Sequence, residues 1–129
     1  MKVLVAEDDI GSSKLVCIIV RRLGLDAVAH FDGQAVIGAC NQENFDLILM
    51  DMNLPGINGL AVTRAIREME LETGGHVPII ALTGHAFPDD RARCLEAGMD
   101  DYLTKPLVMD LLQARVRHWL KLPETPAGQ

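Results

Sequence analysis

The sequence predicts a doubly wound α/β sandwich, in which helices cover both faces of one parallel sheet. Along the 129 residues, short apolar runs alternate five times with segments of helical period. Continuous rather than alternating apolarity is typical of strands that are buried on both faces. Strict alternation of strands and helices indicates right-handed crossovers, and such crossovers make the sheet parallel.

Three strands are predicted by clear apolar runs and two by weaker ones. The clear runs cover residues 3–6, 45–50 and 78–82, and Asp46 interrupts the second of them. The weaker candidates cover residues 27–31 and 101–104. Because the clear runs are apolar almost throughout, we expect helices to cover both of their faces.

Five helices are expected between and after these strands. Ser12 or Ser13 is the expected N-cap of the first helix, and Gly24 lies just beyond its end. Asp32 is a good N-cap for the second helix, and Gly98 follows the fourth. The predicted helices span residues 14–23, 33–42, 60–69, 89–97 and 109–122, and the first carries an apolar stripe of Leu15, Ile18, Ile19 and Leu23.

Composition and charge restrict the class of protein. Apolar residues make up 49% of the chain and charged residues 23%, which is ordinary for a globular domain. The net charge of −6 argues against nucleic-acid binding, which needs a dense basic surface. We expect one domain over residues 1–122, followed by a flexible tail or the start of a linker at residues 123–129.

Cysteine usage and the length of the apolar runs indicate a cytoplasmic location. Cys17, Cys40 and Cys94 are odd in number and far apart, so a disulfide scaffold is not expected. No apolar run approaches the roughly 18 residues that a membrane span needs, and the N-terminus lacks a charged-then-apolar leader. We therefore expect no membrane insertion.

Polar residues gather where the predicted strands end. Glu7 and Asp8 follow the first strand, and Asp51 follows the third. Thr83 follows the fourth strand, and Lys105 follows the fifth. In doubly wound sheets the working site lies beyond the carboxyl ends of the strands. We therefore expect these side chains to share one rim of the sheet.

Carboxylates that crowd on one rim need positive charge nearby. Two like charges 4 Å apart cost about 4 kcal/mol at an effective dielectric of about 20. Lys105 supplies one positive charge, and Mg²⁺, which prefers oxygen ligands, is the expected source of the rest. A transition metal is disfavoured because the four histidines, at positions 30, 76, 85 and 118, are scattered.

Asp51 is the strongest candidate nucleophile. It is the lone acid at the end of the central strand, and a loop of turn-forming residues follows it at positions 53–59. A carboxylate beside a bound cation and a lysine can attack a phosphoryl group, because the cations neutralise charge on its equatorial oxygens. The Thr83 hydroxyl could then bond to the phosphoryl oxygen and report its presence.

In this order and spacing, the strand-end residues resemble the response-regulator receiver domain of two-component signalling. The segments MDMNLPGINGL and GMDDYLTKP contribute to the resemblance, which covers about residues 2–122. It implies a flavodoxin-like (βα)5 three-layer sandwich with strand order 2-1-3-4-5. It also implies a regulated phosphoacceptor with slow self-dephosphorylation rather than an enzyme.

The resemblance assigns the acceptor and metal roles. Asp51 would accept the phosphoryl group from a histidine kinase or a histidine phosphotransfer protein. Asp8 would bind Mg²⁺ directly, and Glu7 would act largely through a metal-bound water. The backbone carbonyl of Asn53, two residues beyond the nucleophile, would be a further metal ligand.

The resemblance also assigns a switch. Lys105 would pair with the phosphoryl group, and Pro106 would hold the Lys105-Pro106 bond in the cis form. Thr83 would be the switch hydroxyl, and Tyr102 would be the aromatic residue that moves inward with it. The downstream target would bind the face made by the fourth helix, the fifth strand and the fifth helix.

Other functions remain open. A phosphatase of the haloacid-dehalogenase type also forms an aspartyl phosphate, but it places a second acid two residues after the nucleophile, where Asn53 stands here. A flavin-binding electron carrier shares the topology, but the acids after the first strand would repel its phosphate. The chain is either a stand-alone regulator or a receiver of a hybrid sensor histidine kinase, and the GMDDYLTKP segment favours the hybrid kinase.

Several of these residues also have plain structural interpretations. Asp9 is interpreted as a residue at the entry to a helix, because an acidic residue at the N-terminus of a helix complements the helix dipole. A half-buried strand tyrosine is the commoner interpretation of a residue such as Tyr102, and its switch role rests wholly on the resemblance. His85 is an exposed loop residue or, with Asn53, tunes the access of water to an acyl phosphate.

Overall fold

Five parallel strands form one sheet in the order β2-β1-β3-β4-β5. The computed structural model describes residues 1–84 and 88–123. The strands are β1 (Lys2–Ala6), β2 (Asp26–His30), β3 (Leu47–Asp51), β4 (Ile79–Thr83) and β5 (Asp101–Thr104). The helices are α1 (Ile10–Arg22), α2 (Gly33–Gln42), α3 (Gly59–Thr73), α4 (Pro88–Ala97) and α5 (Met109–Leu120). The predicted flavodoxin-like fold and its strand order are confirmed.

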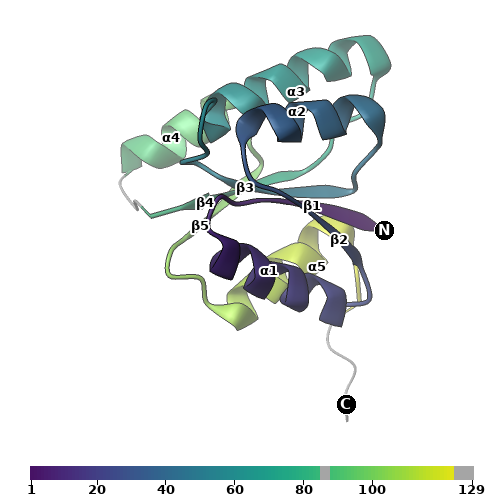
Figure 1. Cartoon of the computed structure of the whole chain (residues 1–129), viewed down its shortest axis with the longest axis vertical. Coiled ribbons are helices and arrows are strands. Elements are labelled where there is room, and N and C mark those ends of the chain that lie inside the picture. The colour runs from purple at the N-terminus through teal and green to yellow at the C-terminus, as the bar shows by residue number, and fades with distance from the viewer. Residues whose placement is uncertain (85–87, 124–129) are drawn as a thin grey trace.

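Helices cover both faces of the sheet. Figure 1 shows α1 and α5 on one face and α2, α3 and α4 on the other. Alternate residues of each central strand enter different cores: Val3 and Val5 pack with α1 and α5, whereas Leu4 and Ala6 pack with the other three helices. Because both faces are buried, β1 and β3 are apolar on both sides, which explains their continuous apolar runs.

The first helix begins earlier than the sequence predicts. Asp9, not Ser12 or Ser13, is its N-cap, and the Asp9 carboxylate accepts a hydrogen bond from the Ser12 N–H at 2.7 Å. The predicted apolar stripe is partly wrong as well, because Leu15 and Ile18 are 49% and 46% exposed. Packing against the sheet selects the face of α1 that carries Val16, Cys17, Ile19 and Val20.

The other helices keep their predicted places; α2 has the predicted ends, whereas the ends of α3 and α5 are shifted. Asp32 caps α2 as predicted, accepting from the Ala35 N–H at 2.8 Å. Helix α3 continues beyond the predicted residue 69 to Thr73, and Gly74 then ends it with a φ of 81°. Helix α5 ends at Leu120 rather than at residue 122, because Lys121 adopts the left-handed conformation.

The structure also bears on the predicted location and tail. Within residues 1–84 and 88–123, no helix is both long and apolar enough to cross a membrane. No disulfide bond joins Cys17, Cys40 or Cys94, all three of which lie within the described residues. Residues 124–129 of the expected tail lie outside the described residues.

Candidate functional site

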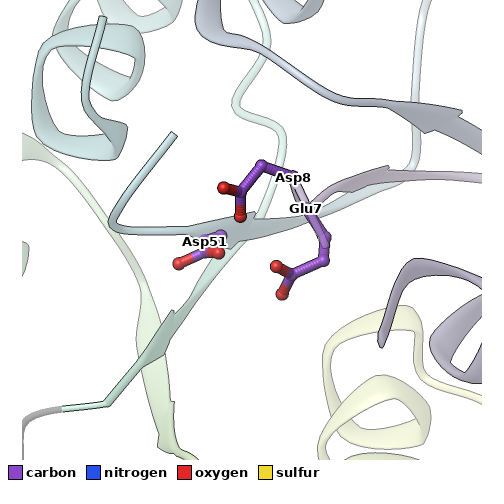
Figure 2. Close-up of side chains that lie close together, drawn as sticks. All are labelled: Glu7, Asp8 and Asp51. Atoms are coloured by element: carbon purple, nitrogen blue, oxygen red, sulfur yellow. The ribbon is translucent and has the colours of Figure 1, made fainter. Parts of the chain in front are cut away.

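Three carboxylates meet at the edge of the sheet where the strands end. Strands β1 and β3 pair in parallel, with Ala6 opposite Met50, so Glu7 and Asp51 leave the sheet side by side. One oxygen each from Glu7, Asp8 and Asp51 lies within 4.8 Å of the others. Figure 2 shows the three side chains close together, with Glu7 and Asp8 at the end of β1 and Asp51 at the end of β3.

The members of this cluster differ in burial. Glu7 is 0% exposed and Asp51 is 2% exposed, whereas Asp8 is exposed. The Glu7 Oε1 atom accepts from the Asp9 N–H at 3.2 Å. The Asp51 Oδ1 atom accepts from the Asn53 N–H at 3.0 Å, so the backbone after β3 turns back onto the carboxylate. Two buried carboxylates therefore share a small space with one exposed carboxylate.

Lys105 bridges the two buried carboxylates. Its Nζ atom lies 2.9 Å from the Glu7 Oε2 atom and 3.1 Å from the Asp51 Oδ2 atom. The Lys105 N–H donates to the Thr83 carbonyl at 2.7 Å, which fixes the lysine at the end of β5 beside β4. The Lys105-Pro106 peptide bond is cis. One ammonium thus balances part of the negative charge, as the strand-end pattern led us to expect.

Burial and charge separate the pKa values of the two buried acids. Burial raises the pKa of Glu7 to about 7, and hydrogen bonding with Asp51 adds to the rise, against the opposing effect of Lys105. Burial alone would raise the pKa of Asp51, but hydrogen bonds with Glu7, the Asn53 N–H and Lys105 lower it. Burial alone would lower the pKa of Lys105, but its two carboxylate partners outweigh this effect, so the pKa is raised. Asp51 is therefore ionised at neutral pH, whereas Glu7 changes its protonation state near neutral pH.

A glycine allows α3 to approach the site closely, which the sequence interpretation missed. A Cβ atom at Gly59 would lie 2.7 Å from the Asp51 carbonyl oxygen and 3.0 Å from the Met52 Cα atom. The Gly59 N–H donates to the Met52 carbonyl at 3.1 Å, and the Asn58 side chain caps the helix. The available signal was a glycine that directly follows a good N-cap residue.

Thr83 lies at the same rim. It ends β4, between the strands that carry Asp51 and Lys105, and it is 3% exposed. Its backbone carbonyl holds the Lys105 N–H, so the threonine and the lysine are fixed relative to each other. His85 lies outside the described residues. The structure thus brings together the predicted acids, the threonine and the lysine.

Tyr102 lies on β5, one strand further out. It is half-buried, as the structural interpretation expected, and the Arg91 guanidinium carbon lies 5.6 Å from the centre of its ring. Its switch role stays a prediction.

The donor set fits a hard divalent cation. All the side-chain ligands offered by the cluster are carboxylate oxygens, which suit Mg²⁺ and do not favour a soft metal. The exposed position of Asp8 gives the cation access from solvent. Among the described residues, Lys105 supplies the one ammonium that pairs with the cluster, and it contacts two of the three carboxylates, so negative charge is in excess there.

Comparison with known proteins identifies the family. Residues 3–117 match the family model described as the response regulator receiver domain. The chain is 42% identical over 116 residues to hybrid signal transduction histidine kinase I of Dictyostelium discoideum, covering 86% of this chain and 7% of that protein. It is 40% identical over 122 residues to the sensor protein GacS of Pseudomonas syringae, covering 94% of this chain and 14% of that protein.

A solved structure supports the same family. It is that of the receiver domain of a sensor histidine kinase from Pseudomonas aeruginosa, described with a magnesium ion in its active-site cleft. The two structures share a TM-score of 0.83 at 37% identity, covering 93% of this chain and 97% of that one. This chain spans only a small part of the curated kinases it matches. The chain therefore belongs to the response regulator receiver domains of two-component signalling.

Proposed function

We propose that this domain accepts a phosphoryl group from a phosphohistidine donor onto Asp51. The observation that carries the proposal is the setting of the Asp51 carboxylate. It lies 3.1 Å from the Lys105 ammonium and within the cluster that also contains Glu7 and Asp8. Its lowered pKa keeps it ionised and therefore nucleophilic at neutral pH.

Mg²⁺ is the cofactor that the cluster suits. Asp8 and Asp51 would hold the ion directly, with Glu7 acting through water and the Asn53 carbonyl as a further ligand. When bound, Mg²⁺ supplies positive charge that neutralises the phosphoryl oxygens. The magnesium described in the Pseudomonas aeruginosa relative supports this assignment.

The transfer exchanges one bond to phosphorus for another. An Asp51 carboxylate oxygen attacks the phosphorus atom, the bond from phosphorus to the donor imidazole nitrogen breaks, and the imidazole leaves with that electron pair. Lys105 then pairs with the phosphoryl oxygens, and the Thr83 hydroxyl bonds to one of them. Water later cleaves the acyl phosphate and restores the Asp51 carboxylate.

On this proposal the domain is a regulated phosphoacceptor in the cytoplasm, not a turnover enzyme. Its donor is a histidine kinase or a histidine phosphotransfer protein, and its output surface is the face of α4, β5 and α5. Thr83 and Tyr102 couple the phosphoryl group to that face. The similarity to hybrid kinases favours a place within such a kinase, with a stand-alone regulator as the alternative.

Intact mass spectrometry tests the acceptor. The protein is incubated with acetyl phosphate or phosphoramidate, with Mg²⁺ or with EDTA. We expect the wild type to gain one phosphoryl group only with Mg²⁺, and Asp51→Asn to stay unmodified. The matched control is Asp26→Asn, an exposed acid at the opposite edge of the sheet, which should behave as the wild type. Modification of Asp51→Asn, or no modification of the folded wild type, would overturn the proposal.

Two further measurements separate the alternatives. Beryllofluoride with Mg²⁺ should shift the amide signals around Thr83 and Tyr102, and should do nothing in Asp51→Asn. Continuous release of phosphate from a small phosphomonoester would instead favour the phosphatase alternative.

A further inference from the structure

One residue, Asp9, joins the carboxylate cluster to the start of α1. Glu7 and Asp8, two members of the cluster, lie in the short connection between β1 and α1. The Asp9 N–H donates to the Glu7 Oε1 atom at 3.2 Å, and the Asp9 carboxylate accepts from the Ser12 N–H at 2.7 Å. Asp9 therefore holds a cluster carboxylate with its backbone and the first turn of α1 with its side chain.

The choice of this cap sets the length of the connection. With Asp9 as the N-cap, residues 7–9 join β1 to α1, and the Asp9 carbonyl accepts a helical hydrogen bond from the Ser13 N–H at 2.9 Å. Ser12 and Ser13 are also good N-caps by residue type. If either serine capped the helix, the cap would move from position 9 to position 12 or 13, and the connection would lengthen by three or four residues.

Asp8 depends on this connection because packing does not hold its side chain. Asp8 is exposed, whereas Glu7 and Asp51 are buried. The backbone on either side of Asp8 is fixed, because the Glu7 N–H donates to the His30 carbonyl at 3.2 Å and the Asp9 N–H donates to the Glu7 carboxylate. Figure 2 shows the Asp8 carboxylate turned toward Asp51. The direction of this exposed carboxylate thus follows from the backbone that Asp9 holds.

We propose that Asp9 is a positioning residue for the Mg²⁺ site, and that it acts by capping α1 rather than by its charge. The inference rests on the proposed function, in which the cluster holds Mg²⁺. Removing a group that orients metal ligands commonly weakens metal binding about 10- to 100-fold. We expect a smaller effect of about three- to tenfold here, because Glu7 and Asp51 keep their contacts with Lys105.

Three substitutions separate the cap from the charge. Asp9→Asn removes the charge and keeps a side-chain oxygen that caps equally well. Asp9→Glu keeps the charge on a side chain that is one carbon longer and is not among the preferred caps, and Asp9→Ala removes both cap and charge. The Mg²⁺ affinity of Asp9→Asn should stay within about twofold of the wild type, and that of the other two variants should fall about three- to tenfold.

NMR measures the affinity and the cap separately in the full 129-residue protein. The Mg²⁺ dissociation constant comes from the amide signals of residues 51–53 in a titration at constant ionic strength, because salt screens general attraction to the net charge. Hydrogen exchange in the metal-free protein reports the cap. The amides of residue 9 and Ser12 should lose protection in Asp9→Ala and Asp9→Glu and keep it in Asp9→Asn.

Asp32→Ala is the matched control. Asp32 caps α2 by accepting from the Ala35 N–H at 2.8 Å, and among the described residues its carboxylate bonds to no member of the cluster. This substitution removes one cap and one negative charge, as Asp9→Ala does, so both variants should lower the midpoint of urea unfolding by a similar amount. Only Asp9→Ala should weaken Mg²⁺ binding, which separates positioning of the ligands from a general loss of stability.

Three outcomes would overturn the inference alone. The first is that Asp9→Ala binds Mg²⁺ as tightly as the wild type. The second is that Asp9→Asn binds weakly and Asp9→Glu normally, since that pattern assigns the effect to charge; this pair decides the matter even if Asp9→Ala does not fold. The third is that Asp32→Ala weakens binding as much as Asp9→Ala. A folded wild type that binds no Mg²⁺ would instead overturn the proposed cofactor, and the inference with it.

Discussion

Replacing Glu7 with glutamine should remove a pH dependence of stability from the metal-free protein. Glu7 is wholly buried, and its pKa is raised from 4.5 to about 7. A folded state that holds a proton more tightly than the unfolded state loses stability as the pH rises through the folded pKa. The wild type should therefore lose about 2–3 kcal/mol of its free energy of unfolding between pH 5 and pH 8 from this group.

The other buried acid should not contribute in that range. The pKa of Asp51 is lowered below its ordinary 3.8, so its stabilising contribution is complete at pH 5 and is lost only in more acidic solution. Of the two buried acids, Glu7 therefore accounts for the slope between pH 5 and pH 8. In Glu7→Gln the amide cannot ionise, and this component of the slope should disappear.

Urea denaturation measures the effect. The free energy of unfolding is obtained by linear extrapolation at pH 5, 6, 7 and 8 in EDTA, for the wild type, Glu7→Gln and Asp8→Asn. Asp8→Asn is the matched control, because it removes an exposed carboxylate from the same cluster and should keep the wild-type slope. Adding Mg²⁺ at pH 8 should stabilise the wild type more than Glu7→Gln, by mass action on the folded state.

Two results would refute the reasoning. A wild-type free energy of unfolding that stays level or rises from pH 5 to pH 8 contradicts the raised pKa. A decline of equal size in Glu7→Gln assigns the pH dependence to another group.

Three further predictions concern other parts of the molecule. Gly59→Ala should lower the free energy of unfolding by about 1–3 kcal/mol, because its Cβ atom would lie 2.7 Å from the Asp51 carbonyl oxygen. Gly38→Ala is the control and should not lower it, because nothing lies within 4 Å of a Cβ atom there. Thermal and urea unfolding compare the two variants. Asp101→Asn should lower the free energy of unfolding by about 1–3 kcal/mol at pH 7, because it weakens the contact with Arg115. The difference from the wild type should shrink below pH 4, because Asp101, whose pKa is lowered, stabilises the fold only while it is ionised. Burial raises the pKa of Cys40 to about 11, so at pH 7.5 iodoacetamide should modify this thiol much more slowly in the folded protein than in the urea-unfolded protein. Peptide mapping measures the two rates, and equal rates would contradict this prediction.

The fold was largely predictable from local patterns. The runs that became β1, β3 and β4 are apolar almost throughout, which required helices on both faces. The start of α1 was not predictable in the same way, because Asp9, Ser12 and Ser13 are all acceptable caps and only the backbone of the finished loop decides among them. The exposure of Leu15 and Ile18 likewise depends on how α1 sits on the sheet.

The chemical groups that reach one rim follow from the order of the strands and their end residues, because parallel strands bring the residues at their carboxyl ends to the same edge. This rule is sufficient to predict that Glu7, Asp51, Thr83 and Lys105 lie together. By contrast, the full burial of Glu7, the exposure of Asp8 and the bridge from Lys105 to Glu7 and Asp51 depend on the packing of the whole domain. The desolvation of a side chain depends on every neighbour in space, and such neighbours can be far apart in the chain: Glu7 and Lys105 are separated by 98 positions.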